Sequence, residues 1–143
     1  MKTLFLLLSF FLLNDAPIWA ATGERRIDFS DMPQSAQTFI TQYFPNDRIA
    51  EIRYDSDTFD KTYEVKFSNG TTIDFNLKGD WTDIECTRAT VPSEIIPVKI
   101  RSDIEQRYPK QVIRGIERSQ KGYEIELSNG HEVKYDSRMT PIR

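Results

Sequence analysis

The sequence predicts an α+β fold of two tandem units, each with one helix followed by a four-stranded antiparallel meander, the helix packed on the sheet. Three observations support this prediction: an internal repeat, proline-bounded segments with helical spacing, and alternating segments that meet at Asn-Gly turns. The chain has 143 residues, 38% of them hydrophobic, which allows one ordinary domain or two very small ones.

The internal repeat is the strongest signal in the chain. With a shift of 64 positions, PQSAQTFITQYFP from Pro33 matches PVKIRSDIEQRYP from Pro97. With a shift of 60, YEVKFSNGTTIDF from Tyr63 matches YEIELSNGHEVKY from Tyr123, and five of these thirteen positions are identical. The four-residue difference falls between Tyr54 and Tyr63, where the first copy has the longer loop.

Each copy begins with a predicted helix. Proline suits the first turn, because the N–H that it lacks would have no intrahelical partner there. A second proline ends each segment, at Pro45 and Pro109. The apolar residues at helical spacing are Ala36, Phe39, Ile40 and Tyr43 in the first copy and Ile100, Ile104 and Tyr108 in the second.

Predicted strands follow each helix. The first copy has strands over 49–54, where the alternation slips once, then 63–67, 73–75 and 81–86. Ser-Asn-Gly turns precede the return strand in both copies. In the second copy only 139–143 is left for a last strand, which is therefore short or frayed. Units of this size are marginal on their own, so we expect them to pack together or to share a sheet.

The first twenty residues, MKTLFLLLSFFLLNDAPIWA, have the pattern of a secretory signal peptide. Lys2 precedes an apolar run over 4–13, which is short for a bilayer span, and small residues follow at Ala16, Ala20 and Ala21. A buried N-terminal helix is the alternative. The predicted organisation is a signal peptide (1–20), a linker (21–31), a first unit (32–90) and a second unit (91–143). The mature chain is expected to be periplasmic or secreted and to have no membrane span.

Composition argues against several classes of function. A single cysteine excludes an intramolecular disulfide framework, and a single histidine excludes clustered-histidine zinc chemistry. A net charge of −3 argues against nucleic-acid binding. Cys86 is expected to be a buried or half-buried strand residue, and His131 to face solvent. Since no catalytic constellation is found, we do not expect an enzyme.

The run Asp55-Ser56-Asp57-Thr58-Phe59-Asp60 lies in the longer loop of the first copy. Closely spaced carboxylates can supply the oxygen ligands of calcium, and the candidates are Asp55, Asp57 and Asp60. The run lacks the glycine and glutamate of an EF-hand loop. An acidic, solvated hairpin loop is therefore the alternative interpretation.

Three aromatic residues are candidates for binding a partner protein: Phe59, Tyr54 and Trp81. Phe59 lies among acidic residues in a loop, where burial is hard to arrange and recognition is common. Tyr54 flanks that loop. Trp81 opens a strand and could anchor an interface, although a tryptophan at such a position is more often part of the core.

Both predicted helices end in an aromatic residue and proline, as Tyr43-Phe44-Pro45 and Tyr108-Pro109. Both copies also contain the stretch Tyr-Glu-Val/Ile-x-Phe/Leu-Ser-Asn-Gly, which starts at Tyr63 and at Tyr123. With these motifs the chain resembles the PepSY-like family of exported bacterial proteins. These proteins are also described as beta-lactamase-inhibitor-like. The resemblance covers nearly all of 32–143, one family repeat for each unit, and implies a periplasmic, non-enzymatic binding or inhibitory module.

Two functions follow as hypotheses. The first is an exported binding module that inhibits or regulates a periplasmic or secreted protein or peptide by steric contact. The alternative is a calcium-responsive periplasmic structural protein that uses the Asp55–Asp60 loop, with calcium as its only candidate cofactor.

Overall fold

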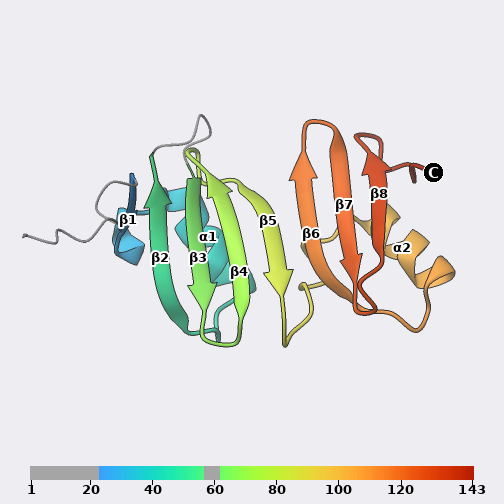
Figure 1. Ribbon diagram of the computed structural model, residues 1–143, viewed down its shortest axis with the longest axis horizontal. Coiled ribbons are helices and arrows are strands. Elements are labelled where there is room, and N and C mark those ends of the chain that lie inside the picture. Colours follow the sequence, from blue (N-terminus) through green and yellow to red (C-terminus); the bar gives the residue numbers. More distant parts are fainter. Residues whose placement is uncertain (1–22, 57–61) are drawn as a thin grey trace, which may run out of the picture.

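The computed structural model describes residues 23–56 and 62–143, and its eight strands form one antiparallel sheet (Figure 1). Both α-helices, α1 (Gln34–Tyr43) and α2 (Val98–Arg107), lie behind the sheet in this view and therefore on the same face. A short 3-10 helix, η2 (Phe29–Asp31), precedes α1. The strands are β1 (Glu24–Arg26), β2 (Ile49–Asp55), β3 (Thr62–Phe67), β4 (Thr71–Asn76), β5 (Trp81–Cys86), β6 (Ile113–Ser119), β7 (Gly122–Leu127) and β8 (Glu132–Asp136).

The prediction of two units that each have a four-stranded meander is wrong. The strands follow one another from β1 to β8 in a single sheet. The first copy supplies β2 to β5, and the second supplies only β6 to β8 and then an isolated bridge between Tyr135 and Pro141. Two physical reasons favour this arrangement. A shared sheet removes two exposed strand edges, and Pro141 has no N–H with which to continue a ladder.

The stretch expected to be a linker, 21–31, contains both β1 and η2. β1 pairs with β2 through Glu24 opposite Asp55, Arg25 opposite Tyr54 and Arg26 opposite Arg53. Neither α-helix in the described part of the chain has the length and apolar run that crossing a bilayer would require.

The two repeats are joined by a short pairing of β5 with β6. Asp83 lies opposite Glu117, Ile84 opposite Ile116, and Glu85 opposite Gly115. Beyond these pairs the two strands separate, as the ribbons in Figure 1 show.

A side chain from the second repeat continues this connection where the pairing stops. The Nε of Arg118 donates a hydrogen bond to the carbonyl oxygen of Trp81 at 2.6 Å. The guanidinium carbon of Arg118 lies 4.1 Å from the centroid of the Trp81 ring. The Arg118 side chain thus connects the two halves of the sheet in place of a further backbone pair.

One hydrophobic core lies between the sheet and the two helices. The two helices are attached to the sheet through equivalent positions with different chemistry. In the first copy, Phe39 meets Phe75 in an edge-on contact with centroids 5.8 Å apart. In the second copy the equivalent residues are Asp103 and Tyr135, and the Tyr135 hydroxyl donates to the Asp103 carboxylate at 2.6 Å. The repeat therefore conserves the position of the contact and not its polarity.

Several local predictions are confirmed. The helices fall inside the two proline-bounded segments. The expected slip in the first strand is a β-bulge between Ile49 and Glu51, and β6 has the same irregularity between Ile113 and Gly115. In the Asn-Gly turns, Gly70 and Gly130 have φ angles of 86° and 81°, which these turns require.

A pair of glycine substitutions tests the close approach of β7 to β8. Gly122 has φ 139°, and a Cβ built there would lie 1.9 Å from the carbonyl oxygen of Tyr135. Gly130 also has a positive φ, but a Cβ there meets nothing within 4 Å. We expect Gly130→Ala to lower the free energy of unfolding by about 1 kcal/mol and Gly122→Ala by clearly more, as measured by urea unfolding. Equal losses in both variants would contradict the register of β7 and β8.

Candidate functional site

The face of the sheet opposite the helices carries a continuous row of charged side chains. Strand pairing places one residue of each strand directly opposite the next, from Arg26 on β1 to Lys134 on β8. In order the row is Arg26, Arg53, Glu64, Asp74, Asp83, Glu117, Glu124 and Lys134. We call the five consecutive carboxylates from Glu64 to Glu124 the acidic row.

A second row runs beside the acidic row on the same face. It consists of Glu51, Lys66, Thr72, Glu85, Gly115, Glu126 and Glu132 in register order. Gly115 leaves a gap between Glu85 and Glu126 at the junction of the repeats. The central part of this open face therefore carries carboxylates from both repeats.

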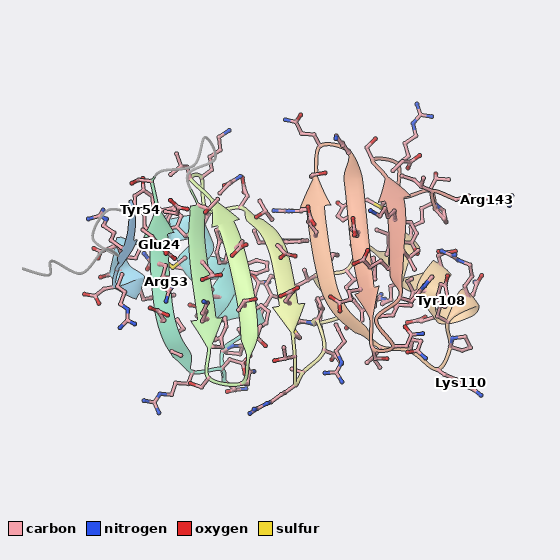
Figure 2. All side chains as sticks on the ribbon, in the orientation of Figure 1. Glu24, Arg53, Tyr54, Tyr108, Lys110 and Arg143 are labelled. Carbon is pink, nitrogen blue, oxygen red and sulfur yellow. The ribbon has the colours of Figure 1, made fainter. Side chains whose placement is uncertain are left out.

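In the part of the chain that the structure describes, ion pairs neutralise only the two ends of the acidic row. Lys66 pairs with Glu64 at 3.1 Å, and Lys134 pairs with Glu124 at 3.1 Å. At the β1–β2 edge, where Figure 2 labels Glu24 and Arg53, these two residues also form an ion pair at 3.1 Å. Among the described residues, none forms an ion pair with the carboxylates at the centre of the face: Asp74, Asp83, Glu85, Glu117 and Glu126.

Burial and neighbouring charges shift the ionisation of two central carboxylates, Asp74 and Asp83. Burial, and then the charges of Glu64 and Glu85, raises the pKa of Asp74 to about 6. Burial is also the main cause at Asp83, where the charges of Asp74, Glu85 and Glu117 add to it and raise the pKa to about 6. Like charges directly opposite one another destabilise a sheet, so this row lowers the stability of the fold. Such perturbed groups are typical of functional sites.

Only one of the three predicted calcium ligands lies in the described part of the chain. Asp55 is the last residue of β2, opposite Thr62, whereas Asp57, Phe59 and Asp60 lie outside the described residues. Within 23–56 and 62–143, no three Asp, Glu, His or Cys side chains come close enough together to hold a metal ion. The described residues alone therefore do not form a calcium site.

The remaining aromatic candidates lie on the helix side of the sheet. The Tyr54 ring lies 5.0 Å from that of Tyr63 and 5.4 Å from the guanidinium carbon of Arg25, at the edge labelled in Figure 2. Trp81 is only 7% exposed, so its ring is part of the core. The structure thus does not bring Tyr54 and Trp81 together on one surface.

Within the described residues, neither the lone cysteine nor the lone histidine has a catalytic neighbour. Cys86 is buried, as predicted, and burial raises the pKa of its thiol, which disfavours the reactive thiolate. His131 is exposed, as predicted, and its Nε2 lies 3.2 Å from the Tyr108 hydroxyl.

Sequence reasoning missed the acidic row. Glu124 and Glu126 fit ordinary charges on the wet face of a strand, and Asp74 and Asp83 look the same when each strand is considered alone. The signal that could have found the row is the pairing register, because it aligns the carboxylates of successive strands.

Comparisons with known proteins identify relatives of the chain. Residues 13–60 and 61–143 match the model of the family described as "Putative beta-lactamase-inhibitor-like, PepSY-like". Among curated proteins, none matches.

Three solved structures are similar over most of the chain. A "putative periplasmic protein" of Bacteroides vulgatus is 37% identical, with 86% of this chain and 97% of that chain covered and a TM-score of 0.82. A "putative calcium-regulated periplasmic protein" of Bacteroides thetaiotaomicron is 38% identical, with 84% and 94% covered and a TM-score of 0.82. A second Bacteroides vulgatus protein, "of unknown function", is 33% identical, with 85% and 98% covered and a TM-score of 0.80. These neighbours confirm the predicted periplasmic or secreted localisation.

The raised pKa values of Asp74 and Asp83 predict a pH-dependent stability. A carboxyl group with a higher pKa in the folded than in the unfolded state binds protons preferentially in the fold, so stability rises as the pH falls from above 6 toward 4. We expect Asp83→Asn to raise the free energy of unfolding at pH 8 by about 1 kcal/mol, since solvent screens part of the full effect. The gain shrinks as the pH is lowered, which thermal melts at several pH values would measure.

A neutralisation on the exposed part of α2, Glu105→Gln, is the matched control and should change the melting temperature little at any pH. If Asp83→Asn destabilised the protein at pH 8, the mutual repulsion in the acidic row would be disproved.

Proposed function

The chain belongs to the PepSY-like, beta-lactamase-inhibitor-like family of exported proteins, and on this basis we propose that it is a non-enzymatic binding module for another exported protein or peptide. The observation that carries the proposal is the set of unpaired carboxylates at the centre of the open sheet face. The partner segment that this surface favours is rich in lysine and arginine.

Electrostatics supports a cationic partner. In the free protein, burial makes the ionisation of Asp74 and Asp83 unfavourable, and the charges of Asp74 and Glu117 add repulsion at Asp83. A partner that placed ammonium or guanidinium groups on this face would remove that repulsion and form charge-assisted hydrogen bonds. Complementary charge also accelerates encounter and selects against acidic partners.

The geometry of the sheet favours binding on the face over pairing at the C-terminal edge. The N–H of Ile142 donates to the carbonyl oxygen of Lys134 at 2.8 Å, and Tyr135 pairs with Pro141, so the chain's own end occupies part of the β8 edge. The open face has no such cover from either helix (Figure 1). If the partner is an enzyme, the sheet would inhibit it sterically by covering its site without being turned over.

Neutralising the centre of the acidic row tests the binding surface. We expect Asp83→Asn combined with Glu117→Gln to weaken the partner complex at least about tenfold at low salt, mainly through slower association, and to make its affinity less dependent on salt. The measurement is affinity capture from native periplasm followed by titration of the captured partner. Because Asp83→Asn should stabilise the fold, lost binding could not be attributed to unfolding.

The matched control removes the same charge from the other side of the molecule. Glu94→Gln with Glu105→Gln neutralises two exposed carboxylates and should leave the partner's affinity unchanged. A partner that bound the acidic-row variant and the wild type equally well would rule out this face as the binding surface, as would the absence of any specific partner.

Calcium responsiveness is the second candidate, favoured by the description of the Bacteroides thetaiotaomicron neighbour as calcium-regulated. In this chain the ligands would be Asp55, Asp57 and Asp60, because the described residues hold no complete metal site among themselves. Asp55 is the last residue of β2, opposite Glu24 of β1 and Thr62 of β3, so binding there would act on this end of the three strands.

Excess calcium should then raise the melting temperature, and EDTA should reverse the rise. Binding to the folded state alone adds about 2.7 kcal/mol at a hundredfold excess over the dissociation constant. Replacing all three aspartates of the loop by asparagine should abolish the rise, whereas Asp74→Asn with Asp83→Asn should retain it. A rise that persisted in the loop variant would eliminate the loop as the site.

A further inference from the structure

A cleft of about 330 Å³ opens on the helix side of the sheet, on the opposite face from the acidic row. It lies between α1 and the segment that leads into α2, above the junction of β5 and β6. Its volume falls in the range of small-molecule sites, about 300 to 1,000 Å³. Four aromatic rings line it, those of Phe39, Tyr43, Trp81 and Tyr123.

One basic group lines this cleft, the guanidinium of Arg118. Its Nε donates to the Trp81 carbonyl oxygen, and its guanidinium carbon lies over the Trp81 ring. Among the described residues, none forms a hydrogen bond with its two terminal nitrogens, and no carboxylate forms an ion pair with it. Burial lowers the pKa of Arg118, which reflects partial loss of water around the cation. The group is therefore oriented in advance, with its carboxylate-binding edge unused.

Two carboxylates add the opposite charge to the lining. Asp80, in the turn between β4 and β5, and Glu94, in the loop before α2, are both exposed. The negative charge of Asp80 favours the protonated form of Arg118 and partly offsets the lowering of its pKa by burial. A simple anion would be attracted by Arg118 and repelled by these two carboxylates, whereas a zwitterion suits both.

The wall beneath Asp80 is rigid. Gly79 has φ 81°, and a Cβ there would lie 2.9 Å from the backbone nitrogen of Ala36. The Ser35 hydroxyl also donates to the carbonyl oxygen of Lys78 at 2.6 Å, which fixes the turn on the first turn of α1. The cleft is thus preformed by packing between α1 and the β4–β5 turn.

We propose that this cleft binds a free aromatic α-amino acid. The carboxylate pairs with the terminal nitrogens of Arg118, the ring packs among Phe39, Tyr43 and Tyr123, and the ammonium faces Asp80 and Glu94. The site is independent of the partner surface, since it lies on the other side of the sheet and shares no residue with the acidic row.

L-Phenylalanine is the probe, titrated into the exported protein by calorimetry and by Trp81 fluorescence. Three analogues each lack one recognised group: 3-phenylpropionate the ammonium, phenethylamine the carboxylate and glycine the ring. We expect phenylalanine to bind and each analogue to bind at least tenfold more weakly. Arg118→Gln should remove the discrimination against phenethylamine, and Glu105→Gln should change nothing.

Arg118→Gln also breaks the contact with Trp81, so a second variant keeps the test decisive if it fails to fold. Tyr43→Ala leaves Arg118 in place and should weaken phenylalanine binding severalfold without affecting phenethylamine discrimination. No binding of phenylalanine up to its solubility limit, or equal binding of phenylalanine and phenethylamine, would overturn the proposal. Unchanged phenylalanine binding in the acidic-row variant would separate this site from the partner surface.

Discussion

Three residue pairs between β5 and β6 make one sheet out of two repeats, and every surface discussed above depends on them. Without this pairing, each repeat would expose a strand edge and hold only half of the core. With it, the carboxylates of β3 and β4 align with those of β6 and β7 on one face. On the other face, Arg118 contacts Trp81, and these two residues line the sheet side of the aromatic cleft. The junction is short, so the side-chain contact of Arg118 contributes where backbone pairing ends.

The two faces of the sheet differ in charge: the helix side holds a partly buried cation, and the open side holds crowded carboxylates. The helix side places one guanidinium against an aromatic ring, where the loss of water is offset by a hydrogen bond and the π-face. The open side gathers carboxylates, and at its centre burial and then the charges of neighbouring carboxylates raise the pKa values of Asp74 and Asp83. A surface that destabilises the free protein is consistent with a binding role, because a cationic partner would relieve the repulsion.

Local features were predictable from sequence because they depend on neighbouring residues. The prolines at 33 and 97 mark where the helices begin, and the Asn-Gly turns mark the hairpins. The slip in the alternation of apolar residues predicts the bulge in β2. The shared sheet and the acidic row depend on the register across β5 and β6, which no local pattern encodes. Trp81 could be assigned to the core from its place in a strand, but its contact with Arg118 joins residues 37 positions apart. Of the predicted metal ligands, only Asp55 lies in the described part of the chain.

Hydrogen exchange of the backbone amides in β5 and β6 tests the central claim, that the two repeats form one sheet. If they do, the amides of the paired segments, 83–85 and 115–117, exchange nearly as slowly as those of β3 and β4 and open in the same cooperative unit. Fast exchange across these segments, with the two repeats opening independently, would contradict the shared sheet, the continuous acidic row and the cleft built on it.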